Sequence, residues 1–387
     1  MADDPPIEAA EFDINDVLRG TKFASLSITD DKKDTLKKVG KKSPWHISAL
    51  TLIAGSEEEA HKPLTYLLDK YMDGLQLDCH IDRSGLTPGG HFLDTQGYIA
   101  HNDDIIVLAY RCTTSIFDWM TNFSTSSSDW ELDEDIAQGY SGMCSGLEGL
   151  CCLGGSAHKP RVHTGFYNNF LASVPDIKQY LEPMLAQDQP PRKLFVCGHS
   201  LGAGVATLAG CYFLLEHDWA KLPHTLIVVT VGSPRACQVG MREHVQKEMN
   251  RLKEQGCSNK AVICRVVNDK DIVASLPPAL FGFRHVDDLV FISDSGNIKF
   301  VGEGEETKCD GAEITYAVAS TPKAFTAVDD GAADEDGEPT EYDRMVQRIP
   351  KTLRDHMPDF YLKPMMRMAM AKSASKTATD SAVEVSF

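Results

Sequence analysis

A short glycine-rich segment, Gly198-His199-Ser200-Leu201-Gly202, most constrains how this chain can fold. It follows the apolar run 194–197 and precedes a run of small residues at 201–210. That order is typical of a strand, a tight turn and a helix, with the serine hydroxyl exposed above the sheet. The helix N-terminus would favour a developing negative charge. We interpret Ser200 as a candidate nucleophile; the alternative is a structural turn with a solvated serine.

Apolar runs and helical patterns alternate along most of the chain. This alternation predicts an α/β fold with a mostly parallel central sheet flanked by helices. Tyr98–Ala100 and Ile105–Tyr110 are expected to pair as a hairpin turning near residues 102–104. The other expected strands are 194–198, 225–231, 262–267 and 289–292, and the expected helices include 166–185, 201–215 and 242–255.

Composition limits the organisation and the partners of the chain. Its 387 residues with 42% hydrophobic content suffice for one large domain or two smaller ones. We predict an N-terminal arm at 1–45, weakly ordered, one α/β domain at 46–371, and a disordered tail at 372–387. Inserts are expected at 124–160 and 322–343. The net charge of −18 disfavours nucleic acid and anionic membranes, and leaves a neutral lipid surface as the easier interface.

The cysteines and the absence of a targeting pattern favour a cytoplasmic protein. There are eleven cysteines, an odd count, and Cys197, Cys211 and Cys264 lie inside apolar segments, as reduced buried thiols do. The first residues are acidic and proline-rich, unlike a secretory signal, and the apolar patch at 47–54 is too short to span a bilayer. Peripheral contact with membranes or lipid droplets stays open.

Four segments together resemble the class 3 (fungal-type) lipases. The resemblance covers residues from about 97 to 361 and implies an α/β-hydrolase fold, hydrolysis of acyl esters in lipids, and no metal or organic cofactor. In order, the segments are Ile106–Arg111 with Cys112-Thr113-Thr114, Val162–Phe166, His199–Gly204 and Arg265–Pro278.

The resemblance also implies a catalytic triad. A serine hydroxyl needs an adjacent base that a third group orients. In this family the acid follows the serine and the histidine comes last, which leaves His285 and His356 after Asp271. Asp271 matches the family's acid, with Asp269 as the alternative. His356, in the segment 353–361, matches the family's base, whereas His285 matches a histidine that is not the base.

Two further features come from the resemblance. The backbone N–H groups of Leu201 and Thr113 would form the oxyanion hole; Cys112 stands where the family commonly has glycine. A lid would follow, because Ile116, Trp119, Met120 and Phe123 share one helical face, with Phe117 beside it. The alternative for this stripe is a core helix.

The expected activity is hydrolysis of mono-, di- or triacylglycerol by Ser200, Asp271 and His356 through an acyl-enzyme. Three alternatives remain: a phospholipase or galactolipase of the same fold, an acyltransferase, and a lipase-like interaction protein without turnover. The sequence leaves open the acyl-chain length, the regiospecificity, the oligomeric state, the role of the inserts, and S-acylation of Cys151 or Cys152. It predicts no metal site.

Overall fold

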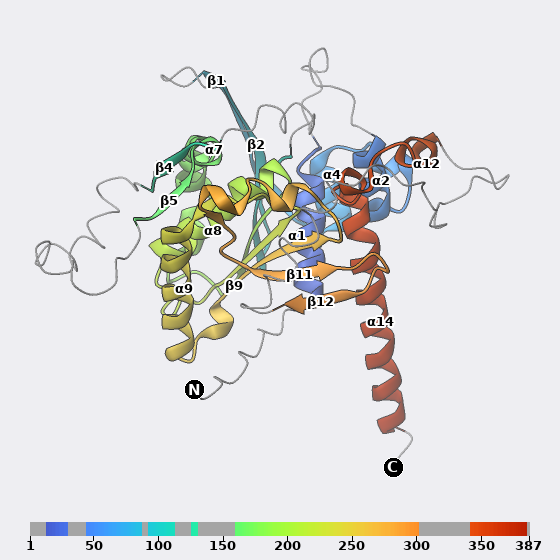
Figure 1. Cartoon of the computed structure of the whole chain (residues 1–387). Coiled ribbons are helices and arrows are strands. Elements are labelled where there is room, and N and C mark those ends of the chain that lie inside the picture. The colour runs from blue at the N-terminus through green and yellow to red at the C-terminus, as the bar shows by residue number, and fades with distance from the viewer. Residues whose placement is uncertain are drawn as a thin grey trace, which may run out of the picture.

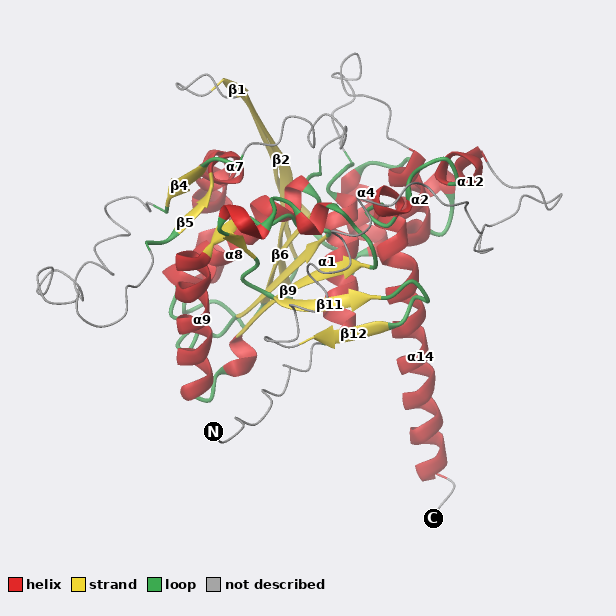
Figure 2. Ribbon diagram, viewed as in Figure 1, coloured by secondary structure: helices red, strands yellow, loops and turns green. Residues whose placement is uncertain are grey.

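A mixed, mostly parallel β-sheet forms the centre of the molecule (Figures 1 and 2). The computed structural model describes residues 13–29, 44–86, 92–112, 125–130, 159–301 and 341–384. Within these residues the sheet has eight strands in the order β1-β2-β3-β6-β7-β9-β11-β12. The strands from β3 to β11 are parallel to one another, and antiparallel strands complete both edges. Their bounds are β1 Gln76–Leu86, β2 Phe92–His101, β3 Ile105–Tyr110, β6 Lys193–His199, β7 Thr225–Val231, β9 Ala261–Asn268, β11 Asp288–Ile292 and β12 Ile298–Val301.

Helices cover both faces of this sheet, which is why most residues of its central strands are apolar. Alternate residues of β3 show the division. Val107 and Ala109 pack with α1 and α2, whereas Ile106 and Leu108 pack with α7 and α8. The first face carries α1 (Ile14–Leu26), α2 (Pro44–Ala54), α4 (Leu64–Tyr71) and α14 (Pro358–Glu384); the second carries α7 (Thr164–Asp176), α8 (Leu201–Glu216) and α9 (Val239–Glu254). The predicted α/β class is confirmed.

The predicted hairpin between β2 and β3 is also confirmed, and its turn has a local cause. The Asn102 side-chain oxygen accepts hydrogen bonds from the backbone N–H groups of Asp104 and Ile105. The preceding strand β1 pairs antiparallel with β2 and extends the sheet beyond what the sequence pattern predicted.

Short elements complete the described fold. A second sheet runs in the order β10-β8-β5-β4, with β4 Ser127–Asp129, β5 Arg161–His163, β8 Cys237–Gln238 and β10 Phe283–Arg284. The remaining helices are α3 Glu57–Ala60, α12 Glu341–Val346 and α13 Lys351–Arg354, with short turns η2 Ile177–Leu181, η3 Glu182–Leu185, η4 Ser258–Lys260, η5 Val273–Ser275 and η6 Ala279–Phe281. Most of the two predicted inserts, including Cys151 and Cys152, lies outside the described residues.

The prediction of a weakly ordered N-terminal arm is wrong for residues 13–29. Helix α1 begins after Asp13, whose side chain caps it by accepting from the Asn15 N–H. The helix then packs against β6 and β7 and contacts α14. Phe23 lies edge-on to Phe195, with ring centroids 5.4 Å apart, and both rings are buried. Acidic and basic residues in this part of the chain suggested an arm. The apolar face of α1, which lies among them, belongs to the core.

The tail that the sequence predicts to be disordered, from residue 372, overlaps the end of the last helix, and its disorder stays a prediction. Helix α14 continues to Glu384. It starts in the core, where Tyr361, Leu362 and Met365 are buried, and extension of an existing helix costs far less than nucleation. No described helix is long and apolar enough to cross a membrane.

Candidate active site

Ser200 occupies a strained turn between β6 and α8, at the carboxyl ends of the parallel strands. Its backbone has φ 58° and ψ −124°, a conformation that non-glycine residues rarely adopt. The flanking glycines explain how the turn closes. A Cβ on Gly198 would lie 2.2 Å from the Gly202 carbonyl oxygen, and one on Gly202 would lie 2.5 Å from that of Tyr110. Neither position has room for a larger residue.

Asp271 and His356 form a buried pair at the same end of the sheet. Asp271 follows β9, and His356 follows the short helix α13. The Nδ1 atom of His356 lies 2.7 Å from Oδ2 of Asp271, and both side chains are almost fully buried. A carboxylate so placed fixes the ring tautomer with the proton on Nδ1, which leaves Nε2 as a proton acceptor. Of the two histidines that the sequence left open, His356 is the one that contacts Asp271.

The Asp271 carboxylate has two further hydrogen-bond donors. Its Oδ1 accepts the Val273 N–H at 2.8 Å. The Tyr361 hydroxyl donates to the same Oδ2 that contacts His356. Burial and the adjacent Asp271 raise the pKa of Tyr361 well above its usual value, so the phenol keeps its proton. Sequence reasoning placed Tyr361 in the segment after His356 but assigned it no role in the site.

Backbone and ring contacts bring Ser200 and His356 into one neighbourhood. The Ser200 N–H donates to the Val231 carbonyl oxygen, and the next residue, Gly232, lies against the His356 ring. A Cβ on Gly232 would come within 2.9 Å of His356 Nδ1. Ser200 Oγ and His356 Nε2 are buried and have no hydrogen-bond partner among the described residues. The hydroxyl and the ring nitrogen that the proposed chemistry needs are therefore uncommitted.

His199 supports the His356 ring from the side. The two rings stack with centroids 4.8 Å apart, and His199 Nε2 donates to the His356 carbonyl oxygen at 2.8 Å. Burial, together with the nearby His356, lowers the pKa of His199 well below its usual value. A neutral His199 adds no second positive charge when His356 takes up a proton.

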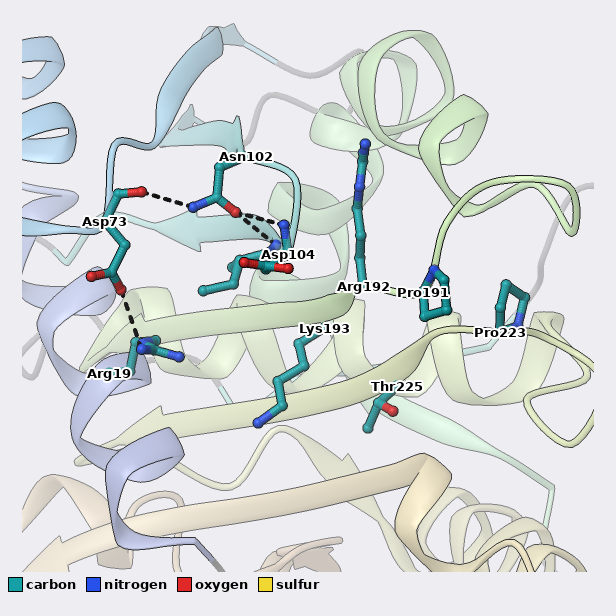
Figure 3. Close-up of a pocket in the computed structure, with 10 residues that line it drawn as sticks. Arg19, Asp73, Asn102, Asp104, Pro191, Arg192, Lys193, Pro223 and Thr225 are labelled. Atoms are coloured by element: carbon teal, nitrogen blue, oxygen red, sulfur yellow. Dashed lines mark hydrogen bonds and ion pairs between the residues drawn. The ribbon is translucent and has the colours of Figure 1, made fainter.

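A cavity of about 590 Å³ lies at the other end of the parallel strands, where their amino ends meet (Figure 3). Its lining includes Ile105, Lys193 and Thr225, the first residues of β3, β6 and β7. Lys193 and Arg19 are paired there with Asp16 and Asp73, at 2.7 and 3.2 Å. Ser200 and Asp271 follow the other ends of the strands, so this cavity is separate from the candidate active site.

Comparison with known proteins gives a family match for the central part of the chain. The family model for lipase (class 3) matches residues 107–281, which include the elbow and Asp271. The lipase of Rhizopus niveus is 25% identical over 243 residues, covering 62% of this chain and 53% of the relative. Residues 107–281 of the chain therefore match the class 3 lipase family.

Other class 3 lipases show the same partial coverage. The secreted mono- and diacylglycerol lipase A of Penicillium cyclopium is 28% identical over 207 residues, covering 53% of this chain and 54% of the relative. The chain thus spans about half the length of these curated relatives. The structure of lipase II from Rhizopus niveus aligns with 75% of this chain and 84% of its own, at 19% identity and a TM-score of 0.46.

The oxyanion hole expected for a class 3 lipase is described in part. Leu201 is the first residue of α8, and helix geometry leaves such an N–H without an intrahelical acceptor. Thr113 lies outside the described residues, as do the predicted lid residues Ile116, Phe117, Trp119, Met120 and Phe123.

Cys112 ends the described part of this loop without strain. It is not among the described residues with positive φ. Its Sγ lies 3.2 Å from Nε2 of His46 in α2, and burial raises the pKa of the thiol to about 12. Cysteine is therefore accommodated where the family commonly has glycine, and the thiol stays protonated.

The two alternatives for the triad have other contacts. His285 donates from Nε2 to the Ala274 carbonyl oxygen at 2.9 Å, and burial, with Arg265 and Arg235 nearby, lowers its pKa well below the usual value. Asp269 pairs with Lys351 at 2.5 Å. Within the described residues, no group of three or more His, Cys, Asp or Glu side chains could hold a metal ion.

Proposed function

We propose that this class 3 lipase hydrolyses acyl esters of lipids, with Ser200 as nucleophile, His356 as base and Asp271 as the acid that orients His356. The observation that carries the proposal is the buried contact of 2.7 Å between Asp271 Oδ2 and His356 Nδ1, beside a serine in a strained strand-to-helix turn. Acyl transfer needs these groups, because a serine hydroxyl is a weak nucleophile without a positioned base.

The proposed reaction has two halves. Ser200 Oγ attacks the acyl carbonyl carbon while its proton passes to His356 Nε2, and the Leu201 and Thr113 N–H groups hold the oxyanion. Collapse breaks the bond to the leaving alcohol, which takes the proton from His356. Water then attacks the acyl-enzyme and gives a proton to His356. The bond between the acyl carbon and Ser200 Oγ breaks, Oγ takes that proton back from His356, and the fatty acid leaves.

The proposed substrates are mono-, di- and triacylglycerols. The match to the class 3 lipase family supports this choice, as does the similarity to the mono- and diacylglycerol lipase of Penicillium cyclopium. Fatty-acid release from emulsified diacylglycerol by purified protein, with covalent labelling of Ser200 by a fluorophosphonate, tests it. Fatty-acid release from phospholipid or galactolipid instead would mean that the substrate carries a polar head group. Product esters in place of fatty acid would identify an acyltransferase. Labelling and release both absent would favour the interaction protein.

An exposed apolar turn supports contact with a neutral lipid surface. Leu280 and Phe281, in η6, are 81% and 48% exposed. Two arginine side chains donate hydrogen bonds to backbone carbonyl oxygens in and before this turn. Arg284 donates to the Ala279 oxygen at 2.7 Å, and Arg235 donates to the Pro277 oxygen at 3.0 Å. Residues 272–286 contain no acidic side chain, although the chain has 56. The turn follows the loop of Asp271 in the chain.

The double variant Leu280→Ser/Phe281→Ser is expected to lower fatty-acid release from emulsions about tenfold, because partial burial of two such side chains in lipid contributes more than the ~1.4 kcal/mol that tenfold requires. Hydrolysis of a short soluble ester should stay within about twofold, since the hydrogen bonds that hold Asp271 and His356 come from other residues. Met370→Ser, 70% exposed on α14, is the matched control. Equal losses on both substrates would contradict lipid contact at this turn.

The predicted lid is tested in the same way. The double variant Phe117→Ser/Trp119→Ser is compared with the wild type on emulsions and on a short soluble ester.

A cytoplasmic location is proposed as well. It is supported by five buried free cysteines among the described residues, Cys112, Cys197, Cys211, Cys237 and Cys264. Burial raises the pKa of Cys197, which keeps that thiol protonated and unreactive. Fractionation of the native cell, with detection of the protein in the soluble and the lipid-droplet fractions, tests the location.

A further inference from the structure

The two segments that carry Asp271 and His356 interlock around the pair itself. The Ile272 N–H donates to the Thr352 carbonyl oxygen at 3.2 Å. On the other side, the Asn268 side-chain amide donates to the Asp355 carbonyl oxygen at 3.0 Å. The residues next to the acid are therefore bound to the residues just before the histidine. Any slip between the segments would change the distance between Asp271 and His356.

Lys351 joins these segments through charge. Its Nζ lies 2.5 Å from Asp269 Oδ2 in the acid-bearing loop and 2.8 Å from Asp355 Oδ2, next to His356. It also lies 2.8 Å from Asp294 Oδ1, in the turn between β11 and β12. One ammonium group thus bridges the loop of the acid, the segment of the base and the edge of the sheet.

The bridge is more than an exposed ion pair. The Lys351, Asp269 and Asp355 side chains are 29%, 17% and 5% exposed. Burial alone would lower the pKa of Lys351, but its hydrogen bonds to Asp269, Asp294 and Asp355 raise it overall. Burial raises the pKa of Asp355 to about 6 despite Lys351. Removing the ammonium would take away the cation that pairs with Asp269 and leave Asp355 with only the more distant Arg354, at 4.0 Å, which is costly for such poorly exposed carboxylates.

Strain in the acid-bearing loop gives the bridge a further role. Asp269 has a positive φ of 35°, which a non-glycine residue adopts only when its surroundings hold it there. Its N–H donates to the Ile292 carbonyl oxygen at 2.7 Å, and its carboxylate is held by Lys351. The backbone N–H of Lys270 donates to Asp355 Oδ2. The loop before Asp271 is therefore fixed by contacts that converge on Lys351 and Asp355.

We propose that Lys351 is a positioning residue that keeps the loop of Asp271 and the segment of His356 in register by bridging Asp269 and Asp355. The proposal rests on the proposed function for the roles of Asp271 and His356. Lys351 contacts neither side chain directly, so it acts through the backbone that carries them.

Lys351→Met tests the bridge, Lys351→Arg restores a cation, and Asp269→Asn removes only the end on the acid-bearing loop. Lys221→Met, which breaks an exposed pair with Asp218, is the matched control. The first readout is the proton resonance of His356 Nδ1–H, which reports the contact with Asp271 whether or not a lipid is hydrolysed. The second is kcat and KM for a soluble ester.

We expect Lys351→Met and Asp269→Asn to shift or broaden that resonance and to lower kcat on the order of 10- to 100-fold with KM unchanged, because misplacement of catalytic groups has effects of this size. Lys351→Arg should recover most of both. An unchanged resonance and kcat in folded Lys351→Met or Asp269→Asn would overturn the proposal. If the wild type hydrolyses no ester, the proposed function fails, and the resonance alone decides the role of Lys351.

Discussion

Ser200→Ala should lower ester hydrolysis by at least about 10³-fold, since the proposed acyl-enzyme forms on the hydroxyl that this variant lacks. The fold should not change. Ser200 Oγ has no hydrogen-bond partner among the described residues, so alanine removes no contact that the native structure uses. Fatty-acid release and the melting temperature, measured on the same preparation, test both parts. Activity that persists in a pure variant would contradict the assignment of the nucleophile.

Ser200→Gly separates catalysis from strain at the same position. Glycine adopts φ 58° and ψ −124° without the steric cost that serine bears there. This variant should be as inactive as Ser200→Ala but more stable, by about 1–3 kcal/mol if all the strain is relieved. A melting temperature at or below that of Ser200→Ala would show that the turn is not strained as the backbone angles indicate.

Asp271→Asn should lower kcat by about 10⁴-fold with the structure intact. Oδ2 accepts from both His356 Nδ1 and the Tyr361 hydroxyl, and Oδ1 accepts from the Val273 N–H. An amide NH₂ cannot face either set of donors without conflict. His356 would then be driven to carry its proton on Nε2, where it cannot accept the proton of Ser200.

Tyr361→Phe should lower kcat less than Asp271→Asn does. It removes one donor from Asp271 Oδ2 and leaves His356 in contact, so we expect a loss of about tenfold, which matches one hydrogen bond to a charged group. Steady-state kinetics on a soluble ester measures both variants. A loss in Tyr361→Phe as large as that in Asp271→Asn would mean that the phenol does more than stabilise the carboxylate.

Local patterns explain why part of the site could be predicted from the sequence. The elbow depends on residues close in the chain, where Gly198 and Gly202 permit contacts that any side chain would block. The strands around it are apolar because both faces of the sheet are covered. The segments of Asp271 and His356 were recognised by resemblance, and the structure brings these two side chains together.

Contacts between distant residues explain what the sequence did not predict. Lys351 and Asp269 are far apart in the chain, and nothing in either local segment indicates that they pair. Helix α1 has an apolar face, but flanking acidic and lysine-rich stretches made it resemble an arm. Tyr361 follows His356 on the next helix, and only the folded position of α14 directs its hydroxyl to Asp271.

The position of α14 has a consequence for how the enzyme matures. Ser200 and Asp271 are synthesised well before His356 and Tyr361, which lie just before and inside this helix. Helix α14 also contacts α1, where the Thr21 hydroxyl lies 3.6 Å from Met365 Sδ. A nascent chain still attached to the ribosome near α13 therefore has the proposed nucleophile and acid but lacks the proposed base. With the proposed triad, esterase activity would begin only after translation has passed the segment that also completes the core.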